Sequence, residues 1–307
     1  IDVKRTIENR CPILKRRLFF HDPMWLDINC VDLRGAVETI EKTSEYDINL
    51  INQNINRTVK PRDLYTNLEQ LRILPDNYLS PEYNDADNQE PKIAVLAHIF
   101  YSDMWDEIYE YIKKIPYKYD LYISTSSEKD ASLLREKTKD IGQFVDVRVV
   151  EQNRGRDMSS LFITFKDIGT SDKYDFICRL HSKKSPQNGF ARADSFKKHL
   201  YENLLSTPEY ITNLIGLMNK RDDIGLISPP LVHIGYPTMG HAWFANYQPT
   251  AELCKKLGVV VPLDDDTPVA VYGTMFWFKP AALRPLFEHD WKWTDFNAEP
   301  AHVDGSL

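Results

Sequence analysis

Residues 145–162, VDVRVVEQNRGRDMSSLF, decide the fold, because a strand pattern gives way to a helix pattern within them. Valines alternate with charged residues at the start of this stretch, and the apolar residues that follow Met158 are typical of a helix. Four residues that can bind a ligand lie between the two patterns: Asn153, Gly155, Arg156 and Asp157. A surface turn needs only the glycine, so the whole set indicates a site that holds a charged ligand.

The same alternation recurs along the chain after residue 90. Six segments have the apolar character of buried strands: 92–100, 119–125, 145–151, 174–181, 223–230 and 269–283. Helical patterns lie between several of them and cover residues 103–115, 128–141 and 196–220. Alternation of continuous apolar strands with helices predicts an α/β fold, in which a mostly parallel sheet is flanked by helices.

The first 90 residues have a different pattern and show no convincing strand. Residues 31–46 and 61–74 have helical spacing, and residues 75–91 are rich in proline, aspartate and asparagine, as linkers are. We therefore predict a helical N-terminal extension with a linker over residues 1–90 and a ligand-binding domain over residues 91–307.

Composition excludes several classes of function. Of 307 residues, 42% are hydrophobic and 27% are charged, which is ordinary for a globular protein. The net charge of −7 argues against binding to nucleic acid, and no apolar run predicts a transmembrane segment. The four cysteines are widely spaced and form no CxxC motif, so we expect reduced thiols and a cytoplasmic location. The first residue, Ile1, and the abrupt end favour a fragment of a longer protein.

In a parallel sheet, ligands bind at the carboxyl ends of the strands. Polar residues follow four of the predicted strands: His98, Ser124, Thr125, the Asn153–Asp157 loop, Arg179, His181, Lys183 and Lys184. This local excess of positive charge in an acidic chain suits a phosphate or diphosphate, and a glycine at 155 would let the backbone approach it. The usual phosphate-loop, dinucleotide, HExxH and GxSxG motifs do not occur.

Structural explanations compete with several of these assignments. Asp157 can be a helix cap paired with Arg156, and Lys183 with Lys184 can be a solvated loop. Packing explains His98 better than a catalytic role does, so it is the weakest of these candidates.

The order of these segments resembles the GT-A fold of nucleotide-sugar glycosyltransferases. Within that fold, the segments CPILKRRLFF, YDINLI, NRGRDMSSLF, RLHSKKS and VDGSL resemble the rhamnan synthesis protein F family of bacterial polysaccharide assembly. The resemblance covers almost the whole chain, and NRGRD together with HSKKS is its most specific part.

The resemblance implies an inverting rhamnosyltransferase that uses dTDP-L-rhamnose to build a cell-surface polysaccharide of the O-antigen or rhamnan type. Its domain over residues 91–307 would then be a GT-A-like catalytic domain that binds a nucleotide-sugar. The implied partners are the nucleotide-sugar donor, a polysaccharide or lipid-linked glycan acceptor and other transferase domains of the same polypeptide. The implied location is the cytoplasm, at the inner face of the plasma membrane.

One departure from the GT-A pattern concerns the metal. Most GT-A enzymes carry a DxD motif that binds a divalent ion at the end of the fourth strand, whereas this chain has LHSKKS there. Imidazole and ammonium groups do not form the oxygen-rich site that Mg²⁺ or Mn²⁺ prefers. They can neutralise a leaving diphosphate directly, so we predict no metal site, no cofactor and metal-independent transfer.

An inverting transfer also needs a general base, which in GT-A enzymes is usually a late carboxylate. The candidates are, in order of preference, Asp304, Glu299 and Asp295. Trp243 and Trp277 lie in aromatic segments and are candidates for the acceptor side, although core packing also explains them.

Two other functions remain open. The chain can transfer a different sugar from another nucleotide-sugar. It can also be a non-catalytic glycan-binding or assembly domain with a degenerate GT-A fold, since it lacks the DxD motif.

Overall fold

The computed structural model describes residues 33–50, 53, 74–84, 90–184, 190–230, 243, 246–260, 263, 271 and 273–299. The chain divides into two compact units, one formed by residues 1–73 and 236–270 and the other by residues 74–235 and 271–307. The first unit contributes helices α3 (Leu33–Thr43) and α11 (Tyr247–Lys256), and the second contains the sheet. Neither unit has a described helix with the length and apolar character to cross a membrane.

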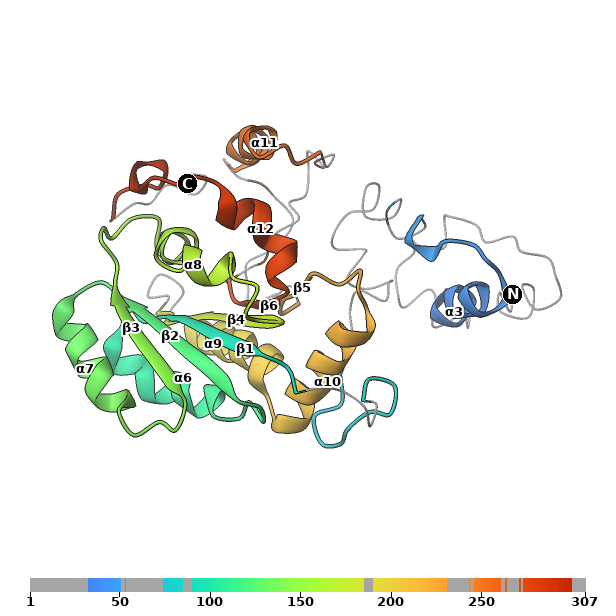
Figure 1. The fold of residues 1–307 in the computed structure, drawn as a ribbon, viewed down its shortest axis with the longest axis horizontal. Coiled ribbons are helices and arrows are strands. Elements are labelled where there is room, and N and C mark those ends of the chain that lie inside the picture. Colours follow the sequence, from blue (N-terminus) through green and yellow to red (C-terminus); the bar gives the residue numbers. More distant parts are fainter. Residues whose placement is uncertain are drawn as a thin grey trace. The chain divides into compact units, whose positions relative to one another are not determined.

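A six-stranded sheet forms the centre of the second unit (Figure 1). Its strands are β1 (Ile93–His98), β2 (Tyr119–Thr125), β3 (Phe144–Val149), β4 (Phe176–His181), β5 (Leu226–Ile227) and β6 (Phe276–Phe278), in the order β3-β2-β1-β4-β6-β5. The first four strands are parallel, and β6 is antiparallel to both of its neighbours. The predicted mostly parallel sheet with flanking helices is confirmed.

Helices cover both faces of the sheet (Figure 1). Side chains of alternate residues in a strand point to opposite faces. On one face, Ala94 and Leu96 belong to a core that contains Phe162, Phe165 and Phe287. These come from the π-helix η3 (Ser160–Thr164), the residue between η3 and α8 (Lys166–Gly169), and α12 (Pro280–Glu288), in that order. The opposite face is covered by α6 (Trp105–Ile112), α7 (Glu128–Thr138) and α9 (Phe190–Leu205). The described part of this unit also contains the short 3-10 helices η2 (Ser102–Met104) and η5 (Trp293–Asp295).

The helical pattern over residues 196–220 forms two helices instead of the single long one expected. Helix α9 ends at Leu205, and α10 (Pro208–Lys220) begins after Thr207, whose hydroxyl accepts a hydrogen bond from the backbone N–H of Tyr210. Proline at the first helical position cannot continue the previous helix but fits the start of a new one. The sequence STP therefore ends one helix and begins another.

The last two strands are shorter than expected. The fifth covers only Leu226–Ile227 of the predicted 223–230, and the sixth covers Phe276–Phe278 of the predicted 269–283. Just before β6 the chain turns, with positive φ at both Gly273 and Thr274, and just after it α12 begins at Pro280.

The predicted linker is packed, at least over residues 74–84. Asn213 of α10 is fully buried, and its side chain accepts hydrogen bonds from Ser80 N (2.9 Å) and from the Asn84 side chain (2.8 Å). It also donates to the carbonyl oxygens of Pro75 and Tyr78, both at 2.9 Å. One buried amide thus holds this segment against α10.

Candidate functional site

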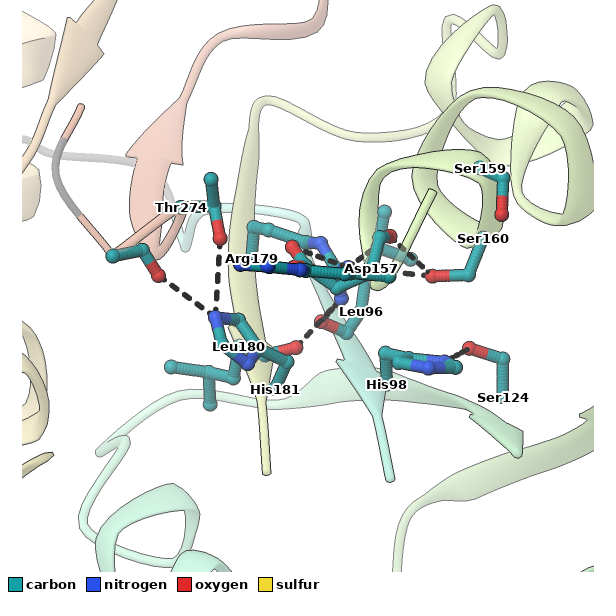
Figure 2. A network of polar contacts seen from close by, with 12 residues as sticks. Leu96, His98, Ser124, Asp157, Ser159, Ser160, Arg179, Leu180, His181 and Thr274 are labelled. Atoms are coloured by element: carbon teal, nitrogen blue, oxygen red, sulfur yellow. Dashed lines mark hydrogen bonds and ion pairs between the residues drawn. The ribbon is translucent and has the colours of Figure 1, made fainter. Parts of the chain in front are cut away.

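Three polar side chains form a row across the carboxyl end of the sheet. Ser124 on β2 is in register with His98 on β1, and His98 is in register with His181 on β4. Residues in register on adjacent parallel strands point to the same face, which here is the face of η3 and α12. His98 Nδ1 lies 2.9 Å from Ser124 Oγ, and Figure 2 shows the two side chains facing each other.

Arg179 lies two residues before the end of β4 on the same face and is fully buried. Its guanidinium donates to the Asp157 carbonyl (2.7 Å), to the Leu180 carbonyl (2.6 Å) and to the Asp157 carboxylate (3.5 Å). Its Nε has no partner among the described residues. The loop after β3 is therefore fastened to the middle of β4 by a buried ion pair.

His181, at the end of β4, contacts the turn before β6 (Figure 2). Its Nε2 lies 2.7 Å from the Gly273 carbonyl oxygen and 3.1 Å from Thr274 Oγ1. Nε2 is closer to the Gly273 carbonyl oxygen (2.7 Å) than Nδ1 is to the Ser182 carbonyl oxygen (3.2 Å), so we assign the single ring hydrogen of the neutral imidazole to Nε2. We refer to Asp157, Arg179, His181 and Thr274 together as the Asp157 network.

The network sets the charges at the strand ends. Burial acts to raise the pKa of Asp157, but the charges of His181 and Arg179 and the Thr274 hydrogen bond outweigh it, so its pKa lies below the ordinary value. Burial lowers the pKa of His98 to about 3, assisted by Arg179. Burial also lowers the pKa of His181, so both imidazoles are neutral near pH 7.

Three cations lie in the loops after two of the parallel strands: Arg156 after β3, and Lys183 and Lys184 after β4. Burial lowers the pKa of Lys183, the charge of Asp157 raises it and the charge of Arg156 lowers it. The Lys183 ammonium is 4.9 Å from the centre of the Phe196 ring. Lys184 instead forms an exposed ion pair with Asp103 at 2.5 Å, so its charge is already matched.

The segment after η5 runs along the NRGRD loop. Gly155 N donates to the Asn297 carbonyl at 2.8 Å, Arg154 forms an antiparallel bridge with Ala298, and Arg156 N donates to the Glu299 carboxylate at 2.9 Å. A Cβ at position 155 would lie 2.7 Å from Phe296 Cδ1, and φ there is +61°. Glycine is needed both for the turn and for this close approach. Two regions predicted from different parts of the sequence thus meet.

The other predicted residues have diverse surroundings. Asn153 is exposed on the loop, and Thr125 Oγ1 is buried without a partner among the described residues. Asp295 accepts a hydrogen bond from Lys292 N at 2.8 Å and so caps η5. Asp304 lies outside the described residues.

The two tryptophans are both buried in the structure. Trp277 is fully buried and donates to the Leu204 carbonyl of α9 at 3.1 Å, so it has no exposed face for an acceptor. Trp243 belongs to the other unit, is 7% exposed and packs edge-to-face on Tyr247.

Sequence analysis missed Gly273, Thr274 and Arg154. The first two fall inside the segment predicted as a long sixth strand, yet a glycine within a strand pattern often marks a turn or a bulge. Arg154 donates to the carbonyl oxygens of Trp293 and Phe296, both at 2.8 Å, and no local pattern predicts such long-range contacts.

Comparisons with known proteins place the chain among relatives. The sequence profile of the rhamnan synthesis protein F family matches residues 2–307. The uncharacterised protein WxcX of Xanthomonas campestris pv. campestris is 26% identical over 221 residues in each of two strains, B100 and ATCC 33913. That alignment covers 71% of this chain but only 30% of WxcX, so the chain spans less than a third of the length of these relatives.

Two solved structures of the mannosyltransferase Ktr4p from S. cerevisiae are also similar. The complex with GDP is 10% identical with a TM-score of 0.34, and the other structure is 9% identical with a TM-score of 0.27. Each alignment covers 84% of this chain and 78% of Ktr4p. Likeness at this level carries no argument about the site.

Proposed function

The chain belongs to the rhamnan synthesis protein F family, and on this basis we propose that it is a glycosyltransferase of bacterial cell-surface polysaccharide synthesis. One observation in the molecule carries the proposal. The NRGRD loop, with Arg156, follows β3 and holds the Glu299 carboxylate through Arg156 N, and Lys183 follows β4, so these groups are all at the carboxyl end of a mostly parallel sheet. This is where such sheets bind nucleotides.

The donor in this proposal is dTDP-L-rhamnose, and the acceptor is a growing polysaccharide or a lipid-linked glycan. The acceptor hydroxyl attacks the anomeric carbon while the bond from that carbon to the diphosphate oxygen breaks. The hydroxyl proton passes to a carboxylate, and dTDP leaves. The whole protein is proposed to act in the cytoplasm at the membrane surface, together with other transferase domains of the same polypeptide.

We propose that transfer is independent of a divalent metal. The support is the chemistry of the residues where a DxD motif is usual: His181 and Lys183 offer no carboxylate oxygen. Lys183 and Arg156 would neutralise the charge that develops on the leaving diphosphate. His98, Ser124, Thr125, Asn153, Gly155, Asp157, Arg179 and Lys184 complete the proposed donor side, with Arg179 acting through Asp157.

The general base is proposed among the late carboxylates. Asp304 is the first candidate and Glu299 the second, and Glu299 already lies on the NRGRD loop through its bond with Arg156 N. We expect Asp304→Asn to abolish transfer while the affinity for dTDP changes little, because a base acts on the acceptor and not on the nucleotide. Glu299→Gln is the parallel variant. Normal turnover by one variant removes that residue from the role.

The deciding experiment incubates the purified protein with a glycan acceptor and a series of dTDP- and GDP-sugars, and measures nucleotide release with and without EDTA. Transfer from dTDP-L-rhamnose that survives EDTA is the expected result. Transfer from another donor corrects the sugar, and activity that EDTA abolishes and Mn²⁺ restores overturns metal independence. Binding of a glycan with no turnover of any donor favours the non-catalytic alternative.

A charge-neutral variant tests the cation directly. We expect Lys183→Gln to weaken dTDP binding by roughly tenfold, because it removes a charge-assisted contact to phosphate. Lys173→Gln is the matched control, since Lys173 is an exposed lysine paired with Asp120 at the start of β2. Isothermal titration calorimetry measures both, and equal affinity of the two variants contradicts the assignment.

A further inference from the structure

The tryptophans of the described part of the chain differ in whether a ring face remains open. Three of them are buried: Trp105, Trp243 and Trp277. Trp291 is partly exposed, but its ring packs on Phe162, with centroids 5.8 Å apart, and on Phe296, with centroids 5.3 Å apart. Trp293 is also partly exposed, and no aromatic ring of the described residues packs on it. It is therefore the tryptophan whose ring is available to a ligand.

Trp293 is held in place at the carboxyl end of the sheet by its edge and its backbone. Its indole Nε1 donates to the carboxylate of Glu151, two residues after β3, at 3.3 Å. Its carbonyl oxygen accepts from Arg154 Nε at 2.8 Å and from Phe296 N at 3.2 Å. None of these contacts uses a face of the ring.

Support of the fold does not explain why this position carries an indole. The two contacts that fasten η5 to the NRGRD loop and to Phe296 are made by the backbone carbonyl of residue 293, which every amino acid has. The side chain is not part of the buried cluster on this face of the sheet. A large ring that stays partly exposed but is oriented by a hydrogen bond at its edge is typical of a binding surface.

Glu151 supplies the polar half of the same surface. It is exposed, and its contact with Trp293 is its single hydrogen bond among the described residues. An ionised carboxylate has about four acceptor positions, so most of them remain for a ligand. A pyranose ring matches this pair, because it has a face of C–H groups that packs on an aromatic ring and hydroxyls at its edge that donate to a carboxylate. The pair is thus suited to a sugar.

The chain places this pair beside the carboxylate that is a candidate base. Arg154 holds Trp293, and the backbone N–H of Arg156 holds the Glu299 carboxylate at 2.9 Å. The two loop residues are two positions apart, so at most about 7 Å separates their Cα atoms. The antiparallel bridge between Arg154 and Ala298 keeps the two segments aligned. Because the base acts on the acceptor hydroxyl, a sugar site beside it belongs to the acceptor and not to the nucleotide.

We propose that Trp293 and Glu151 bind the acceptor glycan. The indole packs on the apolar face of the terminal sugar, and Glu151 accepts hydrogen bonds from its hydroxyls while it orients the indole. A 6-deoxy sugar such as rhamnose suits the ring well, because its methyl group enlarges that apolar face. The inference rests on the proposed function in taking the glycan to be the acceptor of transfer, and it assigns that side to residues that no sequence motif marks.

The first test is calorimetric titration with a rhamnose trisaccharide in the presence of dTDP. Trp293→Ala should bind the trisaccharide about tenfold more weakly, as the loss of a central aromatic contact does. Trp293→Phe keeps a ring face and should retain most of the affinity. Glu151→Gln should weaken binding by about fivefold, because a neutral amide is a weaker acceptor than a carboxylate.

Phe144→Ala is the matched control for loss of an exposed aromatic side chain. Phe144 is 54% exposed and lies at the start of β3, at the opposite end of the same strand. Its variant should bind the trisaccharide like the wild type. Thermal unfolding of every variant identifies any loss of binding that comes from loss of the fold.

Transfer kinetics separate an acceptor site from general support of the fold. With the trisaccharide as acceptor, Trp293→Ala should raise the KM for the acceptor about tenfold and leave the KM for dTDP-L-rhamnose unchanged, since the indole binds only the acceptor. A merely structural role would disturb both constants. Equal changes in the two KM values therefore contradict the assignment.

The outcomes distinguish this inference from the proposed function. If the wild type transfers rhamnose and Trp293→Ala keeps the wild-type affinity and acceptor KM, the acceptor site is wrong and the proposed function stands. If Trp293→Ala weakens trisaccharide binding but no donor is turned over, the glycan site stands and the proposed transfer is wrong. If the wild type does not bind the trisaccharide, the glycan site is wrong, and the donor assay alone decides the proposed function.

Discussion

At the scale of single residues, the neutral His98 shows how burial sets the chemistry of the strand ends. Its side chain is 3% exposed and lies between the Ser124 hydroxyl and the charges of Arg179, Asp157 and His181. An imidazolium there would add a positive charge beside a buried guanidinium. The folded protein therefore disfavours protonation of His98, and its stability depends on pH.

We expect the free energy of unfolding to fall as the pH drops from about 6.5 to about 3. The pKa of His98 is lowered to about 3 in the folded state from an ordinary 6.5. Between these values the unfolded chain binds a proton that the folded chain does not, so stability is complete above pH 6.5 and decreases toward acid. His181, whose pKa is also lowered, acts in the same direction.

The variant His98→Asn tests this contribution because asparagine can still hydrogen-bond Ser124 but does not titrate. Urea unfolding at pH 4.5 and pH 7.5 should show a smaller loss of stability in the variant than in the wild type. An equal loss in both proteins would assign the pH dependence to other groups.

Gly155 offers a second prediction at this scale, with Gly258 as its matched control. Both have positive φ, +61° and +69°, but a Cβ meets Phe296 only at position 155 and meets nothing within 4 Å at position 258. Gly258→Ala should cost about 1 kcal/mol from backbone strain alone. Gly155→Ala should cost at least about 1 kcal/mol more, because Phe296 must also move. Thermal unfolding measures both, and equal costs would mean that Phe296 yields freely.

At the scale of elements, the segment 74–84 and α10 behave as one structure. The fully buried Asn213 side chain makes four hydrogen bonds to this segment, and Leu74 and Tyr83 are buried with it. A segment rich in proline, aspartate and asparagine was predicted as a linker from composition. Composition cannot reveal that a single amide on a distant helix satisfies its backbone.

We expect Asn213→Ala to destabilise the protein by about 2–4 kcal/mol, since buried backbone groups lose their partners. Limited proteolysis should then cut within residues 74–84, which the wild type protects. Asn203→Ala is the control, because among the described residues the Asn203 side chain bonds only to His199 within α9. Protection of the segment in both variants would show that burial of Leu74 and Tyr83 suffices.

The sequence predicts strands better than it predicts helix ends or turns, and the reason is physical. The parallel strands β1, β2, β3 and β4 are continuous apolar or alternating runs, and their predicted bounds differ from the observed ones by at most two residues at either end. The break between α9 and α10 depends on a capping hydroxyl, and the turn at Gly273 depends on His181 as a distant partner. Such features are decided by contacts that a local pattern does not contain.

At the scale of the whole molecule, the site is assembled from parts that are far apart in sequence. The strand ends could be predicted to lie together because parallel strands share an edge. The contact of the NRGRD loop with residues 296–299 could not, since it depends on how the chain returns after α12. The roles of all the predicted site residues stay predictions.

The second compact unit begins at residue 74, and this boundary predicts how truncation of the chain changes its stability. A truncated chain that begins at residue 74 retains the partners of Asn213, whereas one that begins at residue 91 loses them. If both fold, the longer chain should have the higher melting temperature by several degrees, as a loss of about 2–4 kcal/mol implies. Calorimetry of the two chains measures the difference, and equal melting temperatures would favour a functional boundary near residue 90.

The reversed direction of β6 has a consequence for how relatives diversify. Because β6 runs against β4, the beginning of this strand, and not its end, reaches the rim where the four parallel strands finish. The stretch that enters β6 can therefore be lengthened, shortened or exchanged while the four-stranded frame keeps its alignment. If the chain is the sugar transferase that we propose, relatives that use other sugars should differ mainly there, upstream of Thr274, and should retain the four-stranded frame.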